Sequence, residues 1–329
     1  MTMNISGYYR VRIQNNTANA ITVTGSFTIN STNKPTHVWF CQSNAEVGTT
    51  WGYGKLNNLY FPNISYNVNV DNNLTDMWRI TPLYTLSSFV PEAGQLEKGH
   101  INKYGCSITS IAMIFHNLGA ITQTSKYDFR SGASSQLVAD PFSIVMANVG
   151  WQNITYNTGN SHFEITNYQN YQSPAFPYWG TIASAFGKTA TRIDLTGMTS
   201  LQKADIIATY VNNHPEGILV RVDDRHSVVF TDTTHTISSS LNGMEIEEII
   251  ITEENEHEIS YKEYLREREA AESLNMPRNI SSTIYDSEFT CYDPGTQYAS
   301  QGNGVLYSNS FAASQYGGID MVTYIYFFS

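Results

Sequence analysis

The order of two hydrophobic periodicities constrains the fold of this chain more than any other feature of its sequence. After about residue 96, the first apolar patterns have the spacing of helices, and the later ones alternate along the chain as in strands. Helices are predicted at 107–118, from Asp140-Pro141 onward, at 178–186 and at 199–213, and strands at 217–222, 227–232, 289–293 and 321–328. Helices followed by antiparallel strands are the order of an α+β domain.

The beginning of the chain has a different pattern. Between residues 20 and 29, Ile21, Val23, Phe27 and Ile29 alternate with threonine and serine, which is the period of a half-buried strand. Similar short runs are separated by Asn- and Ser-rich turns. We therefore predict a small antiparallel β-sandwich over residues 1–82, serving for binding or attachment with a protein or glycan as its ligand. The α+β domain is predicted to span residues 90–329.

Composition and charge exclude several classes of function. Of the 329 residues, 41% are hydrophobic and 14% are charged, as in a globular protein, and the net charge is −11. Nucleic acids and anionic membrane surfaces attract clusters of Lys and Arg, which this sequence lacks. No run approaches the roughly 20 apolar residues of a membrane span, and the first residues lack the apolar core of a signal peptide. We expect a cytoplasmic protein, or one exported by a non-classical route.

The segment 244–278 differs from the rest of the domain. It holds 11 acidic and four basic residues, so it carries −7 of the net charge. Because such a composition buries little apolar surface, we expect an insertion into the sheet region that protrudes as a hairpin or helix. It would flank the functional cleft of the domain, wherever that lies, or it would be a solvated decoration without a role.

Three residues are candidates for chemistry. Cys106 stands at the start of the helix 107–118, where unpaired N–H groups favour a thiolate and can hold an oxyanion. His226 begins a strand after a polar turn, and Asp293 ends another strand before a proline. In this order they suit a nucleophile, its base and the group that orients the base. Each also has a plain structural interpretation, as a core cysteine, a structural histidine and a turn residue.

A family resemblance supports the first interpretation. The string GCSITSIAMIFHNLGA, residues 105–120, resembles the nucleophile segment of bacteriocin-processing-like cysteine peptidases, which act on double-glycine leaders and belong to the papain-like superfamily. The segment GILVRVDDRHSVVFTD is similar to the histidine strand of that family, and YDPGT to its carboxylate strand. The resemblance, over roughly residues 88–329, implies a papain-like domain with Cys106 as nucleophile, His226 as base, Asp293 as orienting carboxylate and Gln95 in the oxyanion hole.

The chain departs from the family in two ways. Gln95 lies eleven residues before Cys106, farther than in the family, so Asn102 is an alternative oxyanion donor. The acidic insertion separates His226 from Asp293, and Asp232, six residues after the histidine, is the alternative third member.

Other sites are disfavoured. Cys41, Cys106 and Cys291 show no CxxC spacing, which argues against a disulfide framework or zinc finger and leaves at least one free thiol. The Gly187-Lys188-Thr189 run lacks the first glycine and the strand–helix order of a phosphate loop. The group Asp223, Asp224, His226 and His235 lacks the spacing of a metal site, and there is no GxSxG motif.

The sequence therefore predicts a cysteine peptidase that cleaves peptide bonds through a thioester and needs no cofactor. Its substrate would be a peptide or protein. Two alternatives stay open: an acyltransferase or transglutaminase-type enzyme with the same nucleophile, and a catalytically silent binding or structural protein that works through its sandwich.

Overall fold

The structure is a computed structural model of the chain. It describes residues 37–40, 59–60, 105–128, 133–157, 162–165, 177–224, 226–238, 241, 243–272, 289–295, 303–306 and 318–329. The chain divides into two compact units, residues 1–34 and residues 35–329, and every described residue belongs to the second. The sandwich predicted over 1–82 lies almost entirely outside the described residues. The division after Lys34 comes well before the boundary predicted at residues 82–90.

The described part of the second unit is built on a seven-stranded sheet with the strand order β11-β10-β8-β7-β12-β6-β9. Every pair of neighbouring strands in it is antiparallel. The bounds are β6 Ala190–Asp194, β7 Ile218–Val222, β8 His226–Thr233, β9 Ile249–Ile251, β10 Phe289–Tyr292, β11 Asn303–Leu306 and β12 Val322–Phe328.

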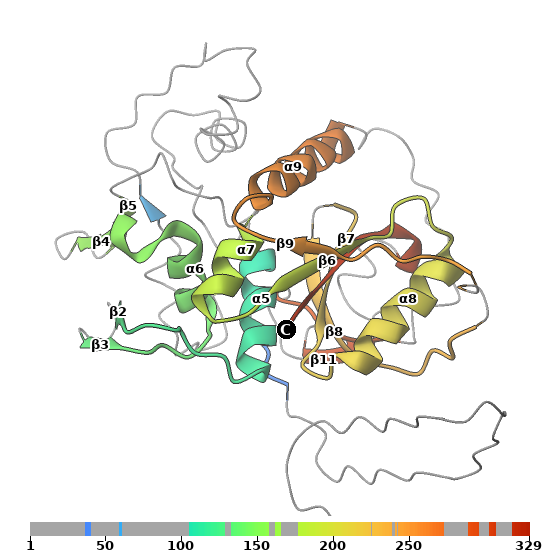
Figure 1. Cartoon of the computed structure of the whole chain (residues 1–329), viewed down its shortest axis with the longest axis horizontal. Helices are drawn as coiled ribbons and strands as arrows, with labels where there is room; N and C mark the ends of the chain where they lie inside the picture. Colours follow the sequence, from blue (N-terminus) through green and yellow to red (C-terminus); the bar gives the residue numbers. More distant parts are fainter. Residues whose placement is uncertain are drawn as a thin grey trace, which may run out of the picture. The chain divides into compact units, whose positions relative to one another are not determined.

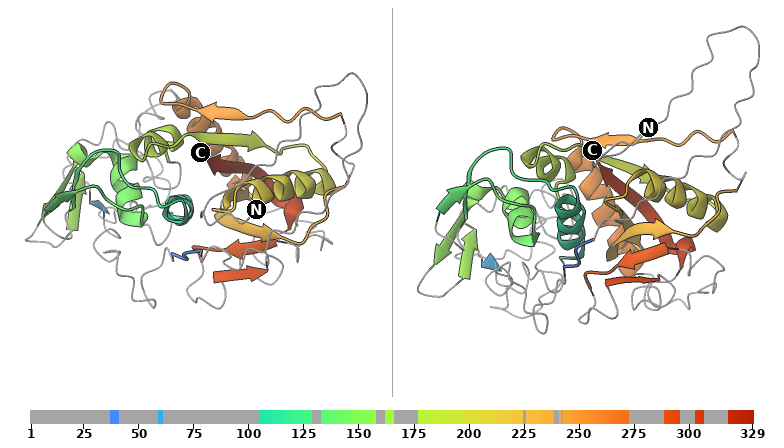
Figure 2. Two further views of the ribbon diagram at one scale, coloured as in Figure 1. Left: turned by 60° about the horizontal axis from the view of Figure 1, so that its bottom comes forward. Right: turned by 90° about the horizontal axis from the view of Figure 1, so that it is seen from below.

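Helices cover both faces of this sheet (Figures 1 and 2). The helices α5 Cys106–Asn117, α6 Pro141–Val149 and α7 Trp179–Ala185 share one hydrophobic cluster with Leu219 and Val229 of the sheet. Helix α8 Ser200–Asn213 packs on the other face, against Ile218 and Val220. Successive residues of β7 therefore enter opposite clusters, as the two-residue period of a strand requires. The predicted α+β class is confirmed, but the order is not simply helices and then strands, because β6 lies between α7 and α8 in the sequence.

Local signals in the sequence explain where the helices begin. Asp140 accepts a hydrogen bond from the backbone N–H of Ser143, whose hydroxyl accepts from the N–H of Asp140, and Pro141 is the first residue of α6. Thr199 and Gln202 form the same reciprocal box at the start of α8. Helix α5 has no side-chain cap, and it is followed by Gly119 with a φ of 65°. The N–H groups of its first turn therefore depend on other partners.

Smaller elements lie beside this core. Strands β2 Lys126–Asp128 and β3 Ala133–Ser135 form a hairpin. Strand β5 His162–Ile165 pairs with β4 Ile154–Asn157 and, in parallel, with β1 Leu59–Tyr60. Two short 3₁₀ helices, η2 Trp151–Asn153 and η7 Ile319–Met321, complete the described elements. No helix in the described part of the chain is long and apolar enough to cross a membrane.

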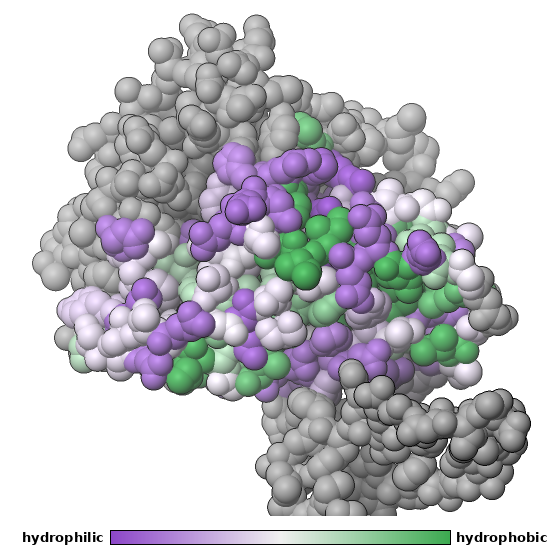
Figure 3. All heavy atoms as spheres, in the orientation of Figure 1, coloured by the Kyte–Doolittle hydropathy of each residue, from purple (hydrophilic) through white to green (hydrophobic). Residues whose placement is uncertain are grey.

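The acidic insertion is integrated into the fold, which differs from the protrusion expected from its composition. Its first half forms β9, which pairs with β6 at the sheet edge opposite β10 and β11. Its second half forms α9 Glu256–Glu272, in which Glu256, Ile259, Ser260 and Glu263 are buried. The outer surface over α9 is hydrophilic (Figure 3). The polar helix α9 thus has a solvated face and a narrow buried face. The net charge of the segment does not indicate that second face.

Candidate active site

Cys106 is the first residue of α5, directly after the N-cap Gly105. Only 6% of its surface is exposed, and α5 packs against β8 and β7. Its place at the helix start puts the thiol near the positive end of the helix dipole. The backbone N–H of Cys106 has no intrahelical carbonyl to bond, because it belongs to the first turn.

His226 begins β8 and contacts both of its predicted partners. Its Nε2 lies 2.7 Å from Oδ1 of Asp293, which directly follows β10. Its ring also hydrogen-bonds the thiol of Cys106, for which Nδ1 is the nitrogen left available. His226 is 4% exposed and Asp293 is fully buried. The structure therefore brings together Cys106, His226 and Asp293, which are far apart in the sequence.

Strand pairing explains why Asp293, and not Asp232, contacts His226. Strands β8 and β10 are antiparallel neighbours, with Tyr292 opposite Val229 and Thr290 opposite Asp232. The chain leaving β10 therefore runs toward the start of β8, where His226 stands, whereas Asp232 lies near the other end of β8. The acidic insertion does not disturb this pairing, because its strand β9 joins the far edge of the sheet.

Gly295 supports the carboxylate and leaves room for the imidazole. Its N–H donates to Oδ1 of Asp293 at 2.8 Å, the same oxygen that contacts His226. A Cβ at Gly295 would lie 2.7 Å from Cε1 of His226, which is closer than real Cβ contacts. The Pro-Gly pair in the sequence indicated a turn here, but not this contact.

The environment lowers the pKa of Cys106 and raises the pKa of His226, so that the order of the two values is reversed and both groups tend to be charged. Burial raises the pKa of the Cys106 thiol, but this effect is outweighed by the hydrogen bond and charge of His226, the charge of Arg221 and a backbone hydrogen bond from Ser227, which bring it to about 7. Burial lowers the pKa of His226, but Asp293 and Cys106 raise it to about 10. A thiolate and an imidazolium are therefore favoured together between these values.

A short segment from the beginning of the second unit contacts the site. We call residues 37–40 the strap. The indole Nε1–H of Trp39 donates to the backbone carbonyl of Asp293 at 2.9 Å. The backbone N–H of Val38 donates to Oδ1 of Asn117, in the last turn of α5, at 3.0 Å. The strap was not predicted from the sequence, because nothing in its composition marks it as a neighbour of the candidate site.

Several candidates lie elsewhere. Gln95, Asn102 and Cys41 fall outside the described residues. Cys291 is fully buried, and burial, followed by the charge of Asp293, raises the pKa of its thiol. Lys188 and Thr189 lie between α7 and β6, in the helix-then-strand order already unlike a phosphate loop.

The histidines considered for a metal site are directed to separate carboxylates. Nε2 of His235 lies 2.7 Å from Oδ1 of Asp205, whereas His226 contacts Asp293. Within the described ranges, no group of three or more His, Cys, Asp or Glu side chains is arranged to hold a metal ion.

Comparisons with known proteins add no relative. No family model, curated protein or solved structure matches this chain.

Proposed function

We propose that this chain is a cysteine peptidase of papain-like architecture, with Cys106, His226 and Asp293 as its catalytic residues. The observation that carries the proposal is the hydrogen-bonded series from the Cys106 thiol to His226 and from His226 to Asp293, located at a helix N-terminus. A structural cysteine in an apolar core has its pKa raised by burial, as at Cys291. Cys106 is also buried, but its pKa is lowered.

The proposed reaction transfers an acyl group to sulfur and then to water. The Cys106 thiolate attacks the carbonyl carbon of the peptide bond, and the developing oxyanion accepts a hydrogen bond from the backbone N–H of Cys106. His226 donates its Nδ1 proton to the departing amine as the C–N bond breaks, which leaves a thioester. His226 then takes a proton from water, whose oxygen attacks the thioester, and the C–S bond breaks to release the acid and the thiolate. Gln95 or Asn102 is proposed as the second oxyanion donor.

Labelling with a thiol-directed electrophile at neutral pH tests this proposal. We expect mass spectrometry of the intact protein to find one rapid modification, at Cys106, and none at Cys291. The Cys106→Ala variant should lose the rapid modification, and Cys291→Ala should keep it, which makes Cys291 the matched control. Slow labelling of Cys106, at the rate of an ordinary thiol, would contradict the proposal.

Peptide profiling then separates hydrolysis from transfer to another acceptor. Wild-type protein is incubated with a mixed peptide library, with and without added primary amine. We expect products with new carboxyl ends, absent with Cys106→Ala. If most products ended in an amide of the added amine rather than in a free carboxyl group, the result would instead favour an acyltransferase.

A further inference from the structure

One buried arginine, Arg221, joins the second residue of α5 to the second residue of β8. Arg221 lies on β7 and is 1% exposed. Its Nη1 donates to Oγ of Ser107 at 3.0 Å and to Oγ of Ser227 at 3.3 Å. Its Nη2 donates to the backbone carbonyl of Asp224 at 2.8 Å. Ser107 directly follows Cys106, and Ser227 directly follows His226.

The two serines also bond to each other. Their Oγ atoms lie 2.9 Å apart, and Ser110, one helical turn after Ser107, donates from Oγ to the carbonyl of Ser227 at 3.2 Å. All three serines are fully buried. Because Ser227 and Arg221 are opposite each other in the β7–β8 pairing, the arginine reaches α5 from directly beside the histidine strand. The network therefore links the start of α5 to the start of β8.

The charge of Arg221 acts on the same site. A guanidinium stays protonated throughout the pH range of proteins, so its field at Cys106 is constant. That field is among the causes that lower the pKa of the Cys106 thiol. Removing a guanidinium from water is costly, and a nearby group that becomes negative offsets part of that cost.

We propose that Arg221, with Ser107 and Ser227, is a positioning residue of the reaction proposed above: it fixes the separation of Cys106 and His226 and stabilises the thiolate. The inference rests on the proposed function, because it assigns a role only if Cys106 is the nucleophile. Arg221 was not among the residues singled out from the sequence, although an arginine inside an otherwise apolar strand, ILVRV, was a usable signal.

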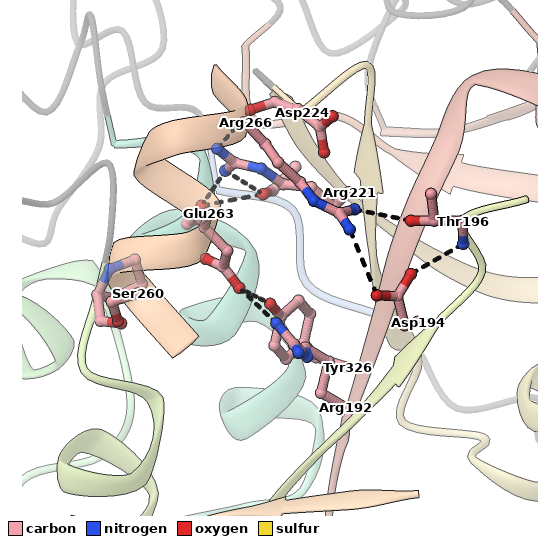
Figure 4. Close-up of polar contacts among 12 residues, drawn as sticks. Arg192, Asp194, Thr196, Arg221, Asp224, Ser260, Glu263, Arg266 and Tyr326 are labelled. Carbon is pink, nitrogen blue, oxygen red and sulfur yellow. Dashed lines mark hydrogen bonds and ion pairs between the residues drawn. The ribbon is translucent and has the colours of Figure 1, made fainter. Parts of the chain in front are cut away.

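Other charged groups surround this network and must be separated from it. His226 acts on Cys106 from β8, Asp293 acts on His226 from the end of β10, and Asp224 lies in the turn beside Arg221. Glu263 approaches from α9, near Arg221 and Asp224 in Figure 4. Burial raises the pKa of Glu263 to about 7, opposed by the charges of Arg221 and Arg192. Glu263 therefore titrates in the same range as the thiol.

The rate of Cys106 alkylation by iodoacetamide, measured against pH, tests the inference. In the wild type we expect the rate to rise with a midpoint near 7, the value to which the thiol pKa is lowered. In Arg221→Met the midpoint should move up by about one pH unit, which lowers the rate about tenfold on the acid side of the midpoint. Arg221→Lys keeps the charge but loses the fork geometry, so its midpoint should return most of the way to the wild-type value.

Two further variants serve as controls. Arg192, on β6, is another buried arginine of the same sheet and contacts Glu263 at 3.8 Å, so Arg192→Met should leave the midpoint unchanged. Glu263→Gln should also leave it unchanged. A midpoint that moves with Glu263→Gln but not with Arg221→Met would assign the titration to α9 and overturn the inference.

The outcomes distinguish the inference from the function on which it rests. A wild-type midpoint near the ordinary thiol pKa of 9.0 would show that Cys106 is not an activated nucleophile, and it would overturn the proposed function. A low wild-type midpoint that Arg221→Met leaves in place overturns the role of Arg221 alone. If Arg221→Met does not fold, the Ser107→Ala/Ser227→Ala double variant decides: we expect its alkylation rate at neutral pH to fall severalfold, and an unchanged rate overturns the positioning role.

Discussion

The imidazole of His226 occupies space that only glycine at position 295 leaves free. Its Cε1 lies 2.7 Å from the point where a Cβ would stand, and the same glycine donates its N–H to Asp293. The geometry of the candidate site therefore depends on the absence of a Cβ at position 295. A displaced imidazole would lose its contact with Cys106, with Asp293 or with both.

We predict that Gly295→Ala lowers turnover of any peptide substrate by about a hundredfold, since a displacement of about 1 Å at a catalytic group has effects of that size. The fold should persist, because the clash falls on a side chain at the end of a strand. Far-UV circular dichroism checks that the fold persists. The rate of Cys106 alkylation at neutral pH reports whether the contact between Cys106 and His226 is disturbed. Gly197→Asn is the control, because nothing lies within 4 Å of a Cβ at Gly197 and asparagine tolerates its positive φ. Wild-type alkylation in Gly295→Ala would contradict the prediction.

The pH dependence of activity follows from the two shifted pKa values. The reactive pair needs Cys106 deprotonated, above about 7, and His226 protonated, below about 10. Asp293 is the largest of the influences that raise the pKa of His226. We predict that Asp293→Asn moves the alkaline limb of the profile to lower pH by at least about one unit. A profile of initial rate against pH checks this, and an unchanged alkaline limb would show that another group produces it.

The same shifts affect stability with opposite signs. The folded-state pKa of His226 is raised from 6.5, so its contribution is fully present below 6.5 and is lost as pH rises through about 10. The folded-state pKa of Cys106 is lowered from 9.0, so its contribution is present above 9.0 and is lost as pH falls through about 7. Between about 7 and 9 the two trends oppose each other, so the pair itself adds little pH dependence in that window.

At the scale of elements, α9 shows how a strongly acidic helix packs. Glu263 is buried and accepts a hydrogen bond from the hydroxyl of Tyr326 on β12, with Arg192 of β6 at 3.8 Å. Arg266 reaches Thr196 at 2.7 Å (Figure 4), whereas the exposed pair Glu258 and Lys262 stays within the helix. Polar contacts to the sheet, rather than pairs within the helix, hold α9 in place.

We predict that Glu263→Gln removes a pH-dependent loss of stability. The folded-state pKa of Glu263 is raised from 4.5 to about 7, so its contribution is fully present below 4.5 and is lost as pH rises through about 7. The loss for the wild type is up to about 3 kcal/mol, and glutamine can still accept from Tyr326 without titrating. Thermal unfolding measured below pH 4.5 and above pH 7 checks this, with the exposed Glu258→Gln as control. Equal pH dependence in wild type and Glu263→Gln would contradict it.

At the scale of the whole molecule, the compact unit that carries the candidate site begins earlier than its secondary structure suggests. The strap links the end of α5 to the residue after β10: Asn117 bonds to Val38 and to the carbonyl of Glu216, and Trp39 bonds to Asp293. His37 packs edge-on against Tyr292, and Phe40 against His116. The compact unit accordingly starts at Pro35.

Truncation at two positions distinguishes this boundary from the one that strand patterns predict. We expect residues 35–329 to keep rapid Cys106 labelling, and residues 90–329 to lose at least about tenfold in labelling rate or to become insoluble, because the hydrogen bond and packing of Trp39 are removed. Trp39→Phe in the full chain isolates the indole hydrogen bond and should produce part of the loss. Full labelling of 90–329 would restore the later boundary.

Local sequence patterns predicted the helices α5 to α8, four strands of the main sheet and the candidate residues of the site, but not the strands β6 and β11. Periodicity, caps and turn residues act over a few positions, so α8, β7 and β8 begin and end within a residue or two of their predicted bounds, and α6 begins where its start was predicted. The same local logic identified Cys106 at a helix start and His226 at a strand start.

The tertiary structure decided which distant groups meet. Asp293 reaches His226 because β10 pairs with β8, and Trp39 reaches Asp293 across 254 positions of sequence. Arg221 and Glu263 are ordinary charged residues in their own segments, and only burial between helices and sheet gives them partners. Such contacts depend on strand order and on packing between faces, which no local pattern encodes, because their free energy arises from groups that are neighbours in space and not in sequence.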